Sequence, residues 1–322
     1  FRSAFAAAWG IFAAGVLEVA LLVWAVRRAG ALAPLTWPKL TADVRQFFKT
    51  VVPATIGSAG VQIAIFADTI IATRLPTGSL SAMYYADRLY QLPVGVIGIA
   101  AGTVLLPEMS RRIAANEPAA ARDAQNRTMA LTLALAAPFF VAFLTIAEPI
   151  IRGVYLRGNF TEAAASLSAS VLMAYGFGLL AIVLLRAAVA SFLAQGDTKT
   201  PMYVSLGAVA VNVALKIALY EPMGIAGLAF ATAAGAWINF GLLVVIAMRR
   251  GWMQPDAAFW KVCVAVAGSS ALLALVAWLG WTPAQRVAAG IGHFQNEIAV
   301  ALLAGAGIVI YGVVLVVALR AL

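Results

Sequence analysis

The stretch "SAMYYADRLYQLPVGVIGIAAGTVLLPEMSRR", residues 81–112, decides the class of fold. It carries an adjacent acid and base, Asp87 and Arg88, and then continues without a charged residue until Glu108. A helix needs about 20 predominantly apolar residues to cross a bilayer. The stretch therefore predicts a membrane helix with an arginine at, or just inside, its mouth.

The composition of the whole chain extends this prediction. Of the 322 residues, 63% are hydrophobic and only 11% are charged, and the mean hydropathy is +0.95. A soluble protein of this length has far more charged surface. A membrane β-barrel would show short segments of alternating polarity, and the sequence has long apolar runs instead. We therefore predict an all-α, polytopic helical membrane protein.

The apolar runs predict nine transmembrane helices, separated by turn and breaker residues. They cover residues 4–26, 47–74, 80–107, 128–151, 167–194, 201–220, 224–248, 258–280 and 297–319. The chain begins "FRSAFAAAWG", without a methionine and without the layout of a signal peptide. We expect it to be part of a longer protein.

The distribution of basic residues predicts how the helices are oriented. The net charge is +9, and alternate loops hold fourteen Lys and Arg residues on one side against five on the other. Cytoplasmic loops are the positive ones, so we expect the C-terminus in the cytoplasm. Because these charges lie mostly between apolar runs, nucleic-acid binding is not expected. One cysteine and one histidine leave almost no material for a metal site, and we predict no cofactor.

Six ionisable residues are predicted at or within the membrane: Glu18, Asp68, Asp87, Arg88, Arg186 and Lys216. Such groups usually face a polar cavity or a partner of opposite charge. Two interpretations stay open for them. They either form static pairs that fix helix packing, or they line a transport pathway.

Helical spacing places several polar residues on one face of the third predicted span. Residues three and four apart share a helix face, and this face holds Ser81, Tyr84, Arg88, Gln91, Gly95, Gly98 and Gly102. Its glycines permit either close helix packing or open volume. Pro93 removes one backbone hydrogen bond and is expected to kink the helix. The outer half of this face is predicted to form a cavity wall.

Three segments resemble those of a known family in the same order. They are "YYADRLYQLPVGVIGIAAGTVLLPEMSR", "AEPIIRGVYLRGNFT" and "FLAQGDTKTP", and they resemble segments of the MurJ (MviN) lipid II flippases of the MOP exporter group. The resemblance implies two six-helix lobes and two further helices. Residues 1–45 would be the last helix of the first lobe and a linker, 46–250 the second lobe, and 251–322 the extra pair. Because most of the first lobe is absent from this chain, we expect the chain alone to be inactive.

The resemblance implies flipping of lipid II across the bacterial inner membrane by alternating access through a cationic central cavity. Lipid II, membrane lipids and proteins of cell-wall synthesis or division are the implied partners. Arg88 is the best candidate for a contact to the pyrophosphate, because arginine meets phosphate oxygens in pairs. Gln91, Ser81 and Tyr84 are further candidates for the substrate cavity. Arg186 is expected either to line the cavity or to pair with Glu18 or Asp68.

Other residues are assigned structural roles in this interpretation. Asp87 and Pro93 are expected to shape or gate the third span, with Asp87 tying its outer end to neighbouring helices. The last two helices are uniformly apolar. The resemblance implies that they form a groove for the polyprenyl tail, although ordinary packing helices would have the same composition.

Four residues form a predicted coupling site: Asp68, Asn212, Lys216 and Thr232. In some members of the family the matching positions are associated with a sodium ion. Lys216 does not suit that role, because its ammonium group is itself a cation. We predict that Lys216 pairs with Asp68 in place of sodium. A fixed structural pair, or a Lys216 side chain that reaches the outer interface, are the alternatives.

Proteins of three other classes share some of these features. A MOP exporter for drugs or polysaccharide-linked lipids would have the same fold, but the "ADRLYQLP" and "QGDTKTP" segments argue against it. An intramembrane transferase would need clustered acids or a metal site, and the thirteen acids are scattered. A scaffold of the cell-wall machinery would not need a polar, kinked helix face.

Overall fold

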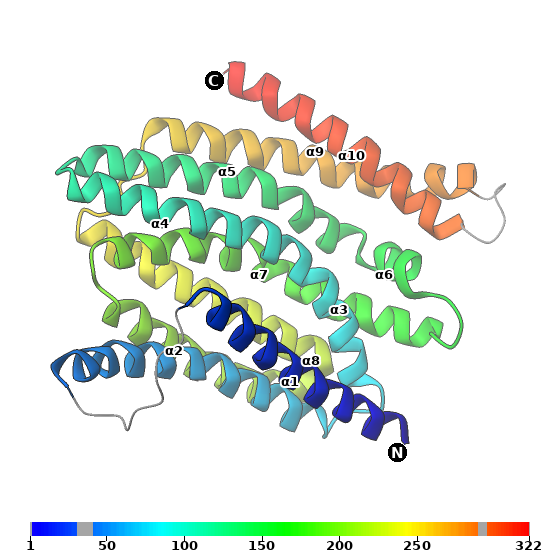
Figure 1. The fold of residues 1–322 in the computed structure, drawn as a ribbon. Helices are drawn as coiled ribbons and strands as arrows, with labels where there is room; N and C mark the ends of the chain where they lie inside the picture. Colours follow the sequence, from blue (N-terminus) through cyan, green and yellow to red (C-terminus); the bar gives the residue numbers. More distant parts are fainter. Residues whose placement is uncertain (1, 31–40, 289–294, 322) are drawn as a thin grey trace. The chain divides into compact units, whose positions relative to one another are not determined.

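The computed structural model describes residues 2–30, 41–288 and 295–321, and in these ranges the chain forms helices joined by turns (Figure 1). This confirms the predicted all-α class for the described residues. The helices are α1 (Arg2–Arg28), α2 (Ala42–Ala72), α3 (Ser79–Pro93), η1 (Val94–Gly98), α4 (Ile99–Ala114), α5 (Pro118–Thr145), α6 (Ala147–Tyr155), α7 (Glu162–Ala194), α8 (Lys199–Arg249), α9 (Ala257–Ala288) and α10 (Gln295–Ala321).

The chain forms two compact units, Phe1–Thr50 and Val51–Leu322. The first unit holds α1 and the beginning of α2. The second holds the rest of α2 and every element from α3 to α10. The predicted division of the chain at residues 45 and 250 into a lobe and flanking helices stays a prediction.

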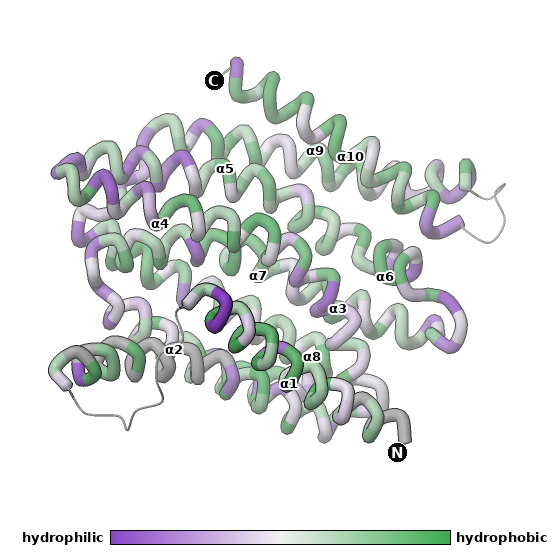
Figure 2. Tube along the Cα trace, viewed as in Figure 1, coloured by the Kyte–Doolittle hydropathy of each residue, from purple (hydrophilic) through white to green (hydrophobic). Residues whose placement is uncertain are grey.

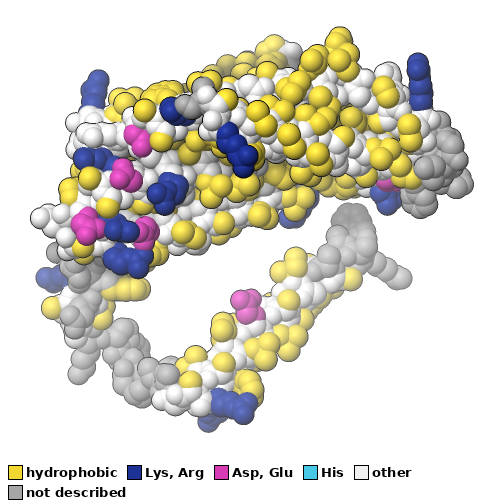
Figure 3. All heavy atoms as spheres, turned by 90° about the horizontal axis from the view of Figure 1, so that it is seen from above, with side chains coloured by type: hydrophobic (Ala, Val, Ile, Leu, Met, Phe, Trp, Pro, Cys, Tyr) yellow, Lys and Arg dark blue, Asp and Glu magenta, His cyan; other side chains and the backbone are white. Residues whose placement is uncertain are grey.

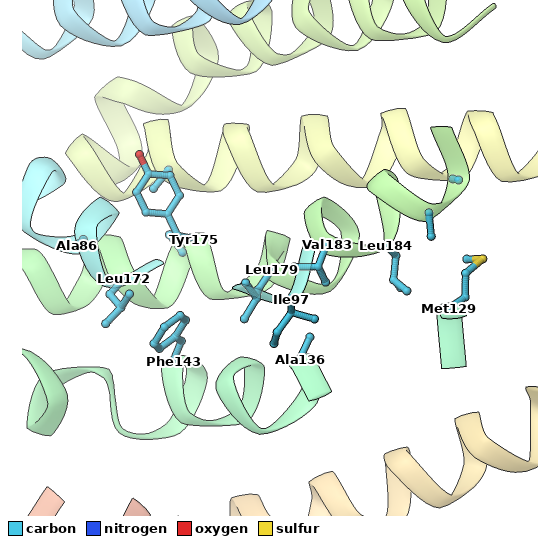
Figure 4. Close-up of a cluster of buried hydrophobic side chains, with 14 of the residues drawn as sticks. Ala86, Ile97, Met129, Ala136, Phe143, Leu172, Tyr175, Leu179, Val183 and Leu184 are labelled. Atoms are coloured by element: carbon cyan, nitrogen blue, oxygen red, sulfur yellow. The ribbon is translucent and has the colours of Figure 1, made fainter. Parts of the chain in front are cut away.

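Helix α7 is the centre of the second unit. It packs against α3, α4, α5, α6 and α8, and it is apolar on all sides, which is typical of a helix surrounded by others. Its side chains Leu172, Leu179 and Val183 are fully buried and lie among residues of α5 and η1 (Figure 4). At Gly178 a Cβ atom would lie 2.7 Å from Cα of Ala233, so only glycine permits this close approach of α7 and α8.

Helix α8 is 51 residues long and folds back on itself at Gly224, where φ is 59° and ψ is −138°. A straight helix of this length would span about 75 Å. Instead, Asp197, just before its start, lies 2.6 Å from Arg250 at its end. The amide of Asn212 also donates a hydrogen bond across the fold to the backbone oxygen of Ala231 (3.3 Å). Helix α8 therefore consists of two antiparallel segments that meet at Gly224. The sequence predicts these segments as two separate spans.

Within the described residues, seven helices are long and apolar enough to cross a membrane. Their apolar middles and more hydrophilic ends are visible in Figure 2. The described residues thus establish several membrane-spanning helices, whereas the predicted count of nine is not reproduced by these seven. The fold of α8 accounts for one of the two missing spans. For α2, the search of the described residues gives a shorter apolar helix, Gln62–Ala72.

The predicted kink at Pro93 takes the form of a π-helical segment. Residues 79–114 form one continuous helical path through α3, η1 and α4, and the five residues of η1 follow Pro93 directly. Proline lacks the N–H group that an α-helical turn would use. A short π-helical stretch is one way in which a helix absorbs such an interruption.

The predicted fourth span, residues 128–151, has the wrong boundaries. Helix α5 ends at Thr145, and the backbone leaves the helical region at Ile146 (φ −129°, ψ 31°). The separate short helix α6 then begins at Ala147. Pro149 lies in the first turn of α6, where its missing N–H group is tolerated. Gly153 of α6 packs closely against α10, because a Cβ atom there would lie 3.4 Å from the backbone oxygen of Asn296.

Polar contacts join the α4–α5, α7–α8 and α8–α9 connections at one end of the second unit. Arg112 pairs with Glu117 (3.0 Å), Arg122 donates to the backbone oxygen of Gly251 (3.3 Å), and Arg250 pairs with Asp197. Charged side chains gather toward one end of this unit in Figure 3, and hydrophobic side chains cover much of its middle. The loop charges predict that all three connections lie on the basic, cytoplasmic side of the membrane.

Candidate transport site

The outer half of the α3 face is exposed, and its arginine is unpaired. Among the described residues, the guanidinium group of Arg88 makes no hydrogen bond and no ion pair, and its side chain is exposed. Ser81, Tyr84 and Gln91 on the same face are exposed as well. Arg88 is therefore free to meet an anion, which the predicted role requires.

Asp87 does not tie α3 to a neighbouring helix through a hydrogen bond among the described residues. Its carboxylate accepts a hydrogen bond from the Gln91 side chain, one turn later on the same helix. This contact shields part of the acid that stands next to Arg88. It also occupies a donor of Gln91 that the sequence suggested for the substrate headgroup.

Tyr155, at the end of α6, lies near Arg88 and was missed by the sequence reasoning. Burial raises the pKa of Tyr155 and the nearby Tyr85 adds to the shift, whereas the positive charge of Arg88 opposes it. The rings of Tyr155 and Tyr85 are 5.0 Å apart. Tyr155 lies in one of the three segments that resemble the family, which could have pointed to it. The sequence of that segment does not show which helix Tyr155 contacts.

The inner half of the same face packs against α7 at Arg186. A Cβ atom on Gly98 would lie 3.6 Å from Cγ of Arg186, and one on Gly102 would lie 3.6 Å from its Cβ. Nothing lies within 4 Å of such an atom on Gly95. A Cβ atom at Gly98 or Gly102 would therefore make only an ordinary van der Waals contact with Arg186, and one at Gly95 would meet open space.

Arg186 also lines a cavity of about 480 Å³ inside the second unit, which we call the polar cavity because five polar residues stand among its otherwise apolar lining. The cavity lies between α2, α4, α7 and both segments of α8. Its polar lining consists of Arg186, Ser205, Asn212, Thr232 and Asn239. One residue predicted for the substrate site and two predicted for the coupling site therefore meet in one cavity, and Arg88 is not part of its lining.

The ion pair expected between Lys216 and Asp68 is present. The Lys216 ammonium nitrogen lies 2.7 Å from Oδ1 of Asp68, and the Lys216 side chain is fully buried. The ammonium group also donates to the backbone oxygen of Ala64 (3.2 Å). The alternative in which Lys216 reaches the outer interface is therefore wrong. The Asp68 carboxylate pairs with Lys216 and not with Arg186. Pairing of Arg186 with Glu18 stays a prediction, because Glu18 belongs to the first unit.

The remaining coupling residues bond within α8. Asn212 donates to the Ala231 oxygen across the fold, and the Thr232 hydroxyl donates to the Leu228 oxygen of its own helix (3.1 Å). Both residues lie in the wall of the polar cavity. The structure thus divides the four predicted residues into one buried ion pair and two cavity-lining residues.

A second cavity, of about 370 Å³, is almost entirely apolar. It lies between α3, α5 and the α9–α10 pair, and residues at its wall include Leu89, Leu92, Pro93, Phe139, Leu273 and Leu303. Helix α3 therefore presents Leu89 and Leu92 to this cavity and Arg88 on a different face.

The arrangement of the helices can be compared with that of solved structures. Solved structures of two transporters resemble the chain at under 25% identity. One is titled "Lipid II flippase MurJ, inward closed conformation", with a TM-score of 0.68 and 23% identity over 86% of this chain and 55% of that one. The other is an outward-facing multidrug resistance MATE family transporter of the MOP superfamily, with a TM-score of 0.56 and 19% identity over 83% and 60%. The fold is that of the MOP-superfamily transporters.

The sequence narrows this class to one family. A family model described as "Lipid II flippase MurJ" matches residues 2–295, and the chain belongs to this family. The predicted resemblance is thereby confirmed. A probable lipid II flippase MurJ of Rhizobium meliloti (strain 1021) is 37% identical over 278 residues, covering 85% of this chain and 52% of the relative. The lipid II flippase MurJ of Burkholderia cenocepacia is 28% identical over 298 residues, covering 88% and 58%. The chain spans about half the length of the curated relatives it matches.

Proposed function

We propose that this chain acts as part of a flippase that moves lipid II across the bacterial inner membrane by alternating access. The single observation that carries the proposal is the exposed, unpaired Arg88 on a membrane-spanning helix of a MurJ-family protein. Ionisable groups in such helices are expensive and usually mark a pathway. The first lobe that the family resemblance predicts would complete the cavity.

The chemistry of the headgroup explains the need for such a residue. A pyrophosphate and its sugars do not cross hydrocarbon unaided, because each unpaired polar group costs several kcal/mol there. Arginine is always charged and has a planar fork of donors that matches phosphate oxygens in pairs. Arg88 offers this fork without first having to break an ion pair among the described residues.

The apolar cavity suits the other end of the same lipid. Its wall combines α3 and α5 with the α9–α10 pair, the pair that the family resemblance assigns to the tail. An apolar wall can hold hydrocarbon by van der Waals packing, as between helices in lipid, and keeps it apart from the polar pathway. We propose that part of the polyprenyl chain occupies this cavity while Arg88 holds the pyrophosphate.

The proposed topology has nine crossings and a cytoplasmic C-terminus. It counts the two segments of α8 separately and includes α2, alongside α1, the α3–α4 path, α5, α7, α9 and α10. The support is the loop charge, which is fourteen basic residues on one side against five on the other.

Replacement of Arg88 tests the proposed function. In the full-length protein, Arg88→Ala should abolish complementation of a flippase-depleted cell at near-normal protein level. Arg88→Lys should rescue poorly, because lysine lacks the paired fork. Arg74→Ala is the matched control, since Arg74 is an exposed arginine in the turn before α3. Full activity of the Arg88→Ala protein would remove Arg88 from the site.

We also propose that the Lys216 ammonium group of the buried Lys216–Asp68 pair supplies a fixed positive charge at positions that are associated with a sodium ion in some family members. The 2.7 Å contact and the full burial of Lys216 support this, because a second cation beside the ammonium group would be repelled. Flipping in vesicles should then continue when sodium is replaced by choline. Activity that requires sodium and saturates with it would refute the proposal.

A further inference from the structure

Arg186 is a membrane-embedded charge that the ion pairs do not account for. Among the described residues it makes no hydrogen bond and no ion pair, and the Asp68 carboxylate is already held by Lys216. Lys216 and Asp68 neutralise each other, which leaves Arg186 as a positive charge without a partner among the described residues. Such a charge normally faces water or a ligand of opposite charge.

The cavity beside Arg186 can accept a small anion. Its volume of about 480 Å³ lies within the usual range of small-molecule sites, roughly 300–1,000 Å³. The hydroxyl-bearing residues Ser205 and Thr232 line it together with Arg186, whereas no acidic residue does. The Oδ1 atoms of Asn212 and Asn239 are buried in the wall without partners, so they do not face an anion in the lumen.

Arg186 and Arg88 lie at different levels along the α3–α4 path. Arg186 packs against this path at Gly98 and Gly102, which follow Arg88 by ten and fourteen residues. At 1.5 Å per residue, the two levels are about 15–20 Å apart. A single pyrophosphate is much shorter than this, so one anion does not contact both guanidinium groups at once.

We propose that Arg186 is a second binding station for the pyrophosphate group, deeper in the membrane than Arg88 and occupied at a different stage of transport. The identity of the anion rests on the proposed function; the station itself rests on the unpaired guanidinium and the cavity. The two stations replace one long, unfavourable step across hydrocarbon by two shorter ones.

Binding of inorganic pyrophosphate tests the two stations directly. The full-length protein in nanodiscs of zwitterionic lipid should bind radiolabelled pyrophosphate at two sites. Arg186→Gln should weaken one site and Arg88→Gln the other, each about tenfold or more. Arg74→Gln should leave both unchanged. A single site in the wild type, or two unaltered sites in the Arg186→Gln protein, would overturn the proposal.

A second pair of measurements separates folding and transport from binding. Arg186→Lys keeps the charge and should retain the deeper site with reduced affinity, whereas a merely structural role would not depend on charge. Transport of polyprenyl pyrophosphate is then measured in vesicles. If the wild type binds two anions but moves no lipid, the proposed function fails and the second station stands. If the wild type moves lipid while Arg186→Gln binds and transports normally, the second station fails and the function stands.

Discussion

Replacing Lys216 by methionine is the sharpest perturbation that the structure offers. The Lys216 side chain is fully buried and that of Asp68 is only 12% exposed. Methionine fills much of the lysine stem's volume, so the main change is the loss of the charge. The Asp68 carboxylate is then left buried without its partner. Breaking a buried pair in this way typically costs about 3–5 kcal/mol of unfolding free energy, which corresponds to a lower midpoint of thermal unfolding by about 4–7 °C.

A double-substitution cycle shows whether this loss belongs to the pair. Asp68→Leu combined with Lys216→Met removes both charges, and such apolar replacements are often neutral or stabilising. The double variant should therefore regain most of the stability that Lys216→Met loses. Thermal unfolding in detergent measures all three proteins, and Lys199→Met, at an exposed lysine, serves as the control. A change below about 0.5 kcal/mol in Lys216→Met, or purely additive losses in the double variant, would refute the reasoning.

Two further predictions concern the ends of the helices. In a Cys263→Ala background, single cysteines at Ala119 and Gln254 should be protected from an impermeant thiol reagent added outside intact cells, and cysteines at Asn159 and Gln285 should react; labelling of the first pair would overturn the orientation. Burial alone would raise the pKa of Asp197, but hydrogen bonds from Thr200 and the charge of Arg250 outweigh it and lower the pKa to about 2. A carboxyl group whose pKa is lower in the folded state stabilises that state at pH values above its unfolded pKa. This stabilisation is lost as the pH falls through the folded-state pKa. Asp197→Asn should therefore destabilise by about 1–2 kcal/mol at pH 7, and the difference from wild type should shrink between about pH 4 and pH 2; a pH-independent difference would contradict it.

The fold class was predictable because long apolar runs leave few alternatives for a backbone in lipid. Boundaries were harder where hydropathy carries no signal. The run around Ile146 is apolar on both sides, yet the backbone turns there and begins α6. At Gly224 the opposite happens. The turn was predicted from its Pro and Gly residues, but helical bonding continues almost to the fold itself, and the two spans merge into α8.

In the candidate site, too, some features were predictable from the sequence and others were not. The Asp68–Lys216 pair was predicted because the family resemblance places both residues at one coupling site, where a buried acid and a buried base need each other. The contacts of Arg186 with Gly98 and Gly102 were not, because spacing in one helix defines a face but not the neighbour that packs on it. The bond from Gln91 to Asp87 was also missed, although residues four apart on a helix are natural partners.

The buried pair also sets a requirement on the order in which the chain is made. Lys216 follows Asp68 by 148 residues. At a synthesis rate of about 5–20 residues per second, α2 waits about 7–30 s for the lysine to emerge. During that interval a carboxyl group that is unfavourable at a helix centre, by about 2.5–3.5 kcal/mol on insertion scales, has no cation from α8. Until α8 is delivered, α2 therefore carries this cost without the partner that the folded chain provides.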